Sequence, residues 1–254
     1  ANQTDGTVRF RVHDNDFSKC AAVYNKDNPV TENTELAIDC WTIDMALADE
    51  KWDVIVLQQM NNYASDEYWY TRKAYSNNLT DLEWLIRYIK LHAQGAPKLG
   101  FHVTWANPMT DSNKSGYINT TSVPDWKNNM EKWYGNNNGN WEDENRITMQ
   151  RTMFAKIRTC TQKYIQPLAE NGTFDYVFFS GAAVQHAFDN AIKTDTAVTA
   201  NENIYRDYTH MSHYGRLLVA YTWYAELEGI TSLNEVKVDT IPAAILHPHD
   251  KSTL

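Results

Sequence analysis

Three short runs of consecutive apolar residues constrain the fold of this chain more strongly than any other feature. They lie at 52–57, 98–105 and 174–179 and are rich in Val, Ile, Leu and Phe. Strands that are apolar on both faces are typical of parallel sheets with helices packed on each side. Because helical patterns alternate with these runs along the chain, the sequence predicts a layered α/β fold.

Five segments have apolar residues at helical spacing. The predicted helices are 43–49, 80–92, 146–169, 182–192 and 212–228. Residues 107–145 between them are rich in Asn, Gly, Ser and Trp, and we expect a long polar loop there. At the N-terminus, Val8, Phe10 and Val12 alternate with arginine and histidine, which predicts a small antiparallel excursion.

Length and charge limit the classes of protein to which the chain can belong. With 254 residues it is long enough for one sizeable core, so we expect a single domain over 1–254. A net charge of -9 argues against nucleic acid as a partner, since that needs a basic face. No apolar run reaches the roughly 20 residues that cross a bilayer. Cys20 and Cys40 are a candidate disulfide if the protein is exported, and unpaired thiols are the alternative.

The carboxyl ends of the predicted strands carry polar residues. These ends are 58–62, 104–108 and 180–181, and they meet at one edge of a parallel sheet, where such folds place their sites. Asp207 precedes His210 by three residues, a spacing that lets one turn present a base and its orienting carboxylate. The alternative is that Asp207 caps the next helix and His210 is a surface histidine. His102 lies inside an apolar run, and we expect a core histidine with satisfied hydrogen bonds.

Four blocks of the chain resemble the SGNH (GDSL-like) hydrolase superfamily, nearest to a bacterial branch of uncharacterised SGNH-like domains. Together these blocks fall within about seven tenths of the chain, in the order that the family requires. The blocks read EKWDVIVLQQ (50–59), KLGFHVTWA (98–106), FSGAAVQ (179–185) and RDYTHMSHYGR (206–216). The last is the most specific, because Asp-x-x-His before a Gly-Arg helix is the superfamily's final block.

The resemblance implies a three-layer α/β/α, flavodoxin-like fold and ester hydrolysis by a Ser–His–Asp triad. It implies His210 as the general base and Asp207 as the carboxylate that orients it. It also implies an oxyanion donor just after the first apolar run, where Gln58, Gln59 and Asn61 are the candidates. A side-chain amide there can donate to a developing oxyanion, and ordinary loop hydrogen bonding is the equal alternative.

The sequence departs from the superfamily at the nucleophile. No apolar strand followed by Gly-Asp-Ser or Gly-Asn-Ser is present, and the early candidate, Val8–Val12 and then His-Asp-Asn-Asp-Phe-Ser18, has no glycine. We expect the first strand and nucleophile elbow to lie upstream or on a second chain. The alternatives are a degenerate member that has lost its serine, and Ser180 as a weaker nucleophile candidate, which an N-cap role already explains.

Two functional hypotheses follow. The first is an SGNH-type serine esterase that removes acetyl groups from a small-molecule or carbohydrate ester, in a secreted or periplasmic location. The second is a catalytically inactive domain of the same fold that binds carbohydrate or a partner, or forms a structural part of an assembly. The chain has no Cys-x-x-Cys pair, so we expect no structural zinc site. We expect no other metal and no cofactor.

Overall fold

The computed structural model describes residues 43–74, 76–108, 142–194, 203–206 and 209–230. Several residues singled out in the sequence lie outside this part: the 8–12 segment, Cys20, Cys40 and Asp207. Most of the loop predicted at 107–145 also lies outside it. The predictions made for these residues therefore remain predictions.

A three-stranded sheet confirms the three apolar runs as strands. β1 (Val54–Gln58), β2 (Lys98–His102) and β3 (Tyr176–Phe178) are arranged in the order β1-β2-β3. β2 and β3 are parallel, with Gly100 opposite Tyr176 and His102 opposite Phe178. The α/β class with a small parallel sheet is thus confirmed, while the finer SGNH-type layering stays a prediction.

All five predicted helices are present. The longest begins at Asp143, earlier than predicted, and passes through a π-helical turn before it ends. Two short helices after β1 were not predicted. The bounds are α3 (Ile43–Asp49), α4 (Asn61–Ala64), α5 (Tyr68–Thr71), α6 (Asp81–His92), α9 (Asp143–Cys160), η1 (Thr161–Ile165), α10 (Gln166–Glu170), α11 (Ser180–Ala191) and α13 (His213–Glu228).

The chain divides into two compact units, of which the first comprises Ala1–Ile55 and Leu82–Lys98. Within its described part, the Trp52 indole N–H donates to Ala46 O at 2.7 Å and so ties α3 to the start of β1. The aromatic rings of Trp84, Tyr88 and His92 stack at i, i+4 spacing along α6. The first contact joins α3 to β1, and the ring stack lies within α6 itself.

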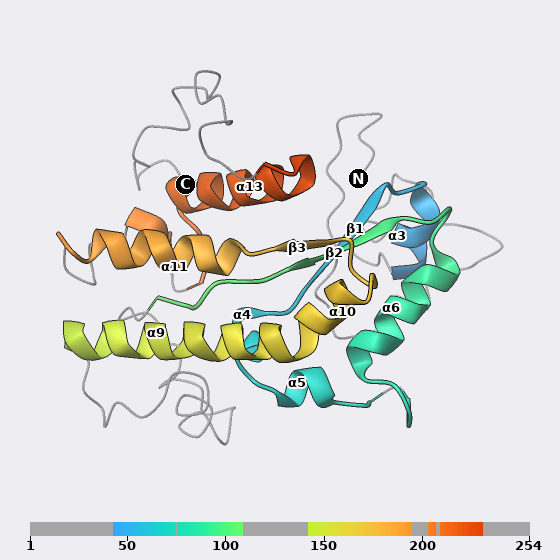
Figure 1. The fold of residues 1–254 in the computed structure, drawn as a ribbon, viewed down its shortest axis with the longest axis horizontal. Helices are drawn as coiled ribbons and strands as arrows, with labels where there is room; N and C mark the ends of the chain where they lie inside the picture. Colours follow the sequence, from blue (N-terminus) through green and yellow to red (C-terminus); the bar gives the residue numbers. More distant parts are fainter. Residues whose placement is uncertain (1–42, 75, 109–141, 195–202, 207–208, 231–254) are drawn as a thin grey trace, which may run out of the picture. The chain divides into compact units, whose positions relative to one another are not determined.

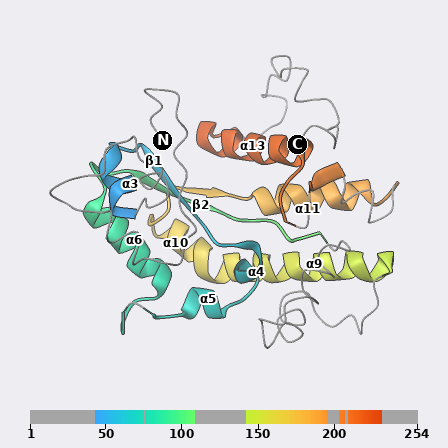
Figure 2. The ribbon, with the colours of Figure 1, turned by 180° about the vertical axis from the view of Figure 1, so that it is seen from behind.

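The second unit comprises Val56–Asp81 and Leu99–Leu254 and holds the carboxyl ends of all three strands. α13 packs on α11 and β3, where the ring of Trp223 stacks on Phe178 at 4.5 Å. α9 packs on α4 and α11, and in Figures 1 and 2 it runs on the opposite side of the strands from α13. The strand ends are therefore covered by helices from both sides.

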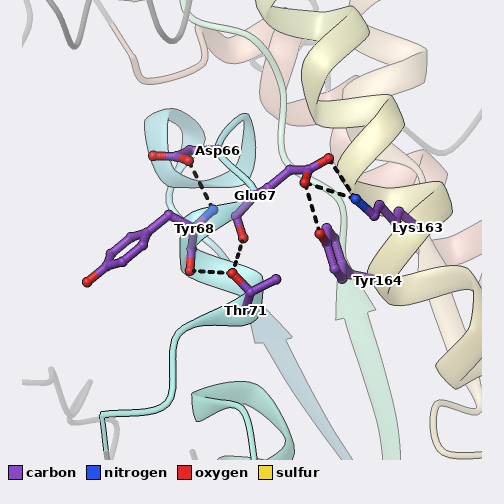
Figure 3. A network of polar contacts seen from close by, with 6 residues as sticks. All are labelled: Asp66, Glu67, Tyr68, Thr71, Lys163 and Tyr164. Atoms are coloured by element: carbon purple, nitrogen blue, oxygen red, sulfur yellow. Dashed lines mark hydrogen bonds and ion pairs between the residues drawn. The ribbon is translucent and has the colours of Figure 1, made fainter.

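The two short helices after β1 are fixed to η1 by Glu67. Its carboxylate accepts hydrogen bonds from Lys163 Nζ at 2.9 and 3.1 Å and from the Tyr164 hydroxyl at 3.1 Å (Figure 3). The hydrogen bond from Lys163 is the main cause that lowers the pKa of Glu67. Thr71 closes α5 by donating to the carbonyls of Glu67 and Tyr68. The segment that follows β1 is thus anchored to η1 through the side chain of Glu67.

The start of α11 lies against the backbone that follows β2. Gly181 N donates to Val103 O at 2.9 Å, and a Cβ on Gly181 would lie 2.0 Å from Thr104 O. No side chain fits there, because backbone atoms on both sides cannot rotate away. Glycine at 181 is therefore required by packing.

We predict that Gly181→Ala destabilises the protein by roughly 3 kcal/mol or more, since the added methyl group overlaps a buried carbonyl. Gly172→Ala is the matched comparison. That glycine has φ of +76°, and no atom lies within 4 Å of the place that a Cβ would take, so alanine should cost only about 1 kcal/mol. Urea unfolding of both variants measures the difference, and equal losses would contradict the close approach at Gly181.

Candidate functional site

Residues 103–108 leave the strand at the carboxyl end of β2 yet remain almost entirely buried. Buried peptide groups need hydrogen-bond partners, and here most come from side chains of distant segments. Val103 N donates to Phe178 O at 2.9 Å, and the Tyr205 hydroxyl donates to Ala106 O at 2.6 Å. Asn107 N donates to the Met153 sulfur at 3.2 Å. This irregular segment is the centre of the candidate site.

Asn61, one of the three oxyanion candidates, is buried and binds this segment. Its Nδ2 donates to Trp105 O at 2.8 Å, and its Oδ1 lies 3.5 Å from the Thr209 hydroxyl. The neighbouring Asn62 accepts a hydrogen bond from Asn107 Nδ2 at 2.7 Å. The structure therefore gives Asn61 a role in joining the ends of β1 and β2, which is the loop hydrogen bonding expected as an alternative.

The turn that carries His210 is held against the same segment. The Thr209 hydroxyl donates to Asn107 Oδ1 at 3.1 Å, and the Trp105 indole N–H donates to Thr209 O at 2.8 Å. Arg206 N donates to His210 O at 2.8 Å, and Tyr205 pairs with Met211 in an antiparallel bridge. His210 itself is exposed. The residue beside it is thus fixed to the loops that follow β1 and β2.

The N-cap of the following helix is Ser212. Its hydroxyl accepts from Gly215 N at 3.2 Å and donates to Asn203 O at 2.7 Å. The alternative in which Asp207 caps this helix is wrong, because Ser212 occupies that position. The side chain of Asp207 lies outside the described residues, so its pairing with His210 stays a prediction.

Gln58 and Gln59 differ in what holds them. Gln58 ends β1, and its Oε1 lies 2.8 Å from Nδ1 of His102, the last residue of β2. Among the described residues, Gln59 Oε1 accepts only from the backbone N–H of its own neighbour, Met60, at 3.0 Å. Of the two glutamines, Gln58 is therefore the one whose amide is fixed by another strand.

His102 is a core residue, as predicted, with 4% of its surface exposed. Its ring lies edge-on to Trp223 at 5.2 Å and is tilted against Trp105 at 5.8 Å. Burial lowers its pKa to about 4, so the ring is neutral at physiological pH. The prediction that its hydrogen bonds are satisfied is only half right, because Nε2 has no partner within the described part of the chain.

Ser180, the weaker nucleophile candidate, is fully buried as the first residue of α11. The N-cap position is Phe179, and no side chain makes a capping hydrogen bond there, so the N-cap role predicted for Ser180 is wrong. Its hydroxyl finds no hydrogen-bond partner among the described residues. An ester cannot reach a hydroxyl without accessible surface unless α11 moves.

Sequence reasoning missed four residues that build this edge: Trp105, Asn107, Tyr205 and Thr209. Each acts through a long-range hydrogen bond to a backbone or amide group, and such pairings leave no periodic pattern. Asn107 carried a partial signal, since it follows the second apolar run at the predicted carboxyl end. The Tyr205 hydroxyl also accepts a hydrogen bond from Gln150 Nε2 of α9 at 3.4 Å. Gln150 Oε1 accepts one in turn from Gln185 Nε2 of α11 at 3.1 Å.

The described residues hold no group of three His, Cys, Asp or Glu side chains able to bind a metal ion. None of the helices seen in this part of the chain is long and apolar enough to cross a membrane.

Comparisons with known proteins give one structural similarity. No family model matches the chain, and neither does any curated protein. The crystal structure of a DUF4886 family protein from Bacteroides uniformis ATCC 8492 is similar with a TM-score of 0.48 and 22% sequence identity. The similarity covers 82% of this chain and 62% of that one, so the chain spans less than two thirds of the length of its neighbour.

We predict that His102 makes the stability of the protein pH-dependent. In the unfolded chain its pKa returns to about 6.5, so the unfolded state binds a proton that the folded state excludes between about pH 6.5 and pH 4. The free energy of unfolding should therefore fall by about 2 kcal/mol as the pH drops from about 7 to about 5.

Urea unfolding at the two pH values measures this loss. His102→Phe should remove most of it, because phenylalanine keeps a ring in the core and takes up no proton. The exposed His186→Gln is the control and should leave the loss unchanged. A pH dependence that persists in full in His102→Phe would show that other groups cause it.

Proposed function

We propose that this chain carries the base and oxyanion-donor part of an SGNH-type serine ester hydrolase. One observation supports the proposal above the others. Thr209, next to His210, is hydrogen-bonded to Asn107 and to Trp105 Nε1, in the loop after β2. That loop is tied in turn to Asn61 after β1. A general base and amide donors that meet at the carboxyl edge of a parallel sheet suit acyl transfer.

In the proposed reaction, His210 takes the proton from a serine hydroxyl as its oxygen bonds to the ester carbon. The ester C–O bond then breaks, and the imidazolium returns the proton to the leaving alkoxide. Water releases the acid in a second, equivalent cycle. Asp207 orients the ring of His210, and the reacting serine lies outside the described residues or on a second chain.

The substrate proposed is an acetyl ester of a carbohydrate. Support comes from aromatic side chains in the segment after β1, next in the chain to the candidate donors. Tyr68 is 54% exposed, and its ring meets Trp69 edge-on at 5.4 Å. Exposed rings of this kind suit the apolar faces of sugars. The same observation favours the second candidate function, a domain of this fold that binds carbohydrate without cleaving it.

We predict that the intact protein hydrolyses p-nitrophenyl acetate and that His210→Ala lowers kcat at least about 1000-fold, as loss of a triad base does. Release of p-nitrophenolate at neutral pH measures the rate. The control is His186→Ala, an exposed histidine of α11 that contacts Asn190 of the same helix, which should retain the parent rate.

The outcome separates the two candidate functions. No turnover by the intact protein, together with retained binding of acetylated oligosaccharides, would replace the esterase with the binding domain. Equal rates for the parent and His210→Ala would remove His210 from the mechanism even if hydrolysis occurs.

A further inference from the structure

The amide of Gln58 is held by a buried group from the neighbouring strand. Gln58 is exposed at the end of β1, and its Oε1 lies 2.8 Å from His102 Nδ1. A carbonyl oxygen can only accept, so in this contact Nδ1 carries the hydrogen. The amide NH₂ of Gln58 then points away from His102, and it makes no hydrogen bond to any described residue.

The ring that makes this contact has little freedom to move. It is 4% exposed and lies between Trp105 and Trp223. Burial keeps it neutral, and a neutral ring with a hydrogen on Nδ1 has a bare Nε2. That assignment agrees with the absence of a partner for Nε2 in the described chain. The donor that faces Gln58 is thus fixed in both protonation and direction.

The other two candidates lack this arrangement. Both polar atoms of the Asn61 amide face groups of the site: Trp105 O and the Thr209 hydroxyl. Within the described part of the chain, Gln59 is held only by the backbone N–H of Met60. A donor accelerates acyl transfer when it is already oriented before charge develops, so a fixed and unoccupied NH₂ is the useful one.

We propose that His102 is a positioning residue that holds the Gln58 carboxamide with its NH₂ directed outward, as the hydrogen-bond donor to a substrate oxyanion. This role rests on the ester hydrolysis proposed above and assigns the donor among its three candidates. It predicts that the two residues act as one unit.

Kinetics with p-nitrophenyl acetate test the coupling. Gln58→Ala and His102→Phe should each lower kcat about 100-fold, with KM changed by no more than about twofold. The double variant should lose little beyond either single variant. His102→Asn places an amide N–H near the position of Nδ1 and should recover most of the rate. Fully additive losses, or no recovery with asparagine, would overturn the proposal.

A second measurement does not depend on activity. The side-chain ¹⁵N–H₂ signal of Gln58, assigned by its loss in Gln58→Ala, should shift when acetate is added as an oxyanion probe. In His102→Phe that shift should be lost or much reduced. A response of the same size in His102→Phe, or none in the parent protein, would overturn the positioning role. If the parent protein is inactive but the shift depends on His102, the donor stands and the esterase function falls.

Discussion

Residues 103–108 must keep their peptide groups hydrogen-bonded after the sheet has ended, and the candidate site depends on this requirement. β3 stops at Phe178, so β2 loses its strand partner beyond His102 while its backbone stays buried. An unpaired buried peptide group costs about 1–3 kcal/mol, so each needs a donor or acceptor from elsewhere. Asn61, Tyr205 and Gly181, from three distant parts of the sequence, donate to three carbonyls of this segment: those of Trp105, Ala106 and Val103.

The same requirement explains the small and polar residues at this edge. Gly181 is needed because its backbone lies against Thr104 O. Asn107 and Thr209 face one another because both chain segments converge on the end of β2. The turn before α13 is therefore fixed by hydrogen bonds on its inner side, and the exposed His210 is carried on its outer side. A rigid support with an accessible imidazole suits the general-base role that we propose for His210.

The amides at and just after the end of β1 have separate roles. Asn61 is buried and ties two loops together, whereas Gln58 is exposed and, among the described residues, only its oxygen is hydrogen-bonded. Residue type cannot distinguish these roles, because glutamine and asparagine offer the same donor and acceptor. The difference arises from neighbours: His102 lies beside Gln58 only because β1 and β2 are adjacent in the sheet. The burial of His102 keeps it neutral and keeps this contact a hydrogen bond without charge.

The amino-acid pattern alone predicted the three strands, the five longer helices and the edge at which the polar strand ends meet. Apolar continuity and helical spacing are local patterns that burial enforces, so they can be recognised without coordinates. The same pattern predicted a strand that continues to Trp105, whereas β2 ends at His102. The prediction was too long because a buried irregular segment is as apolar as a strand.

The packing of whole elements against one another determines which polar side chains bind the backbone and which remain available to a ligand. That choice depends on hydrogen bonds between residues far apart in sequence, such as Tyr205 with Ala106 and Gln58 with His102. The same packing places Ser212 at the N-cap of α13 and buries Ser180 completely. Such pairings follow from the positions of whole elements, and no local pattern in the sequence records them.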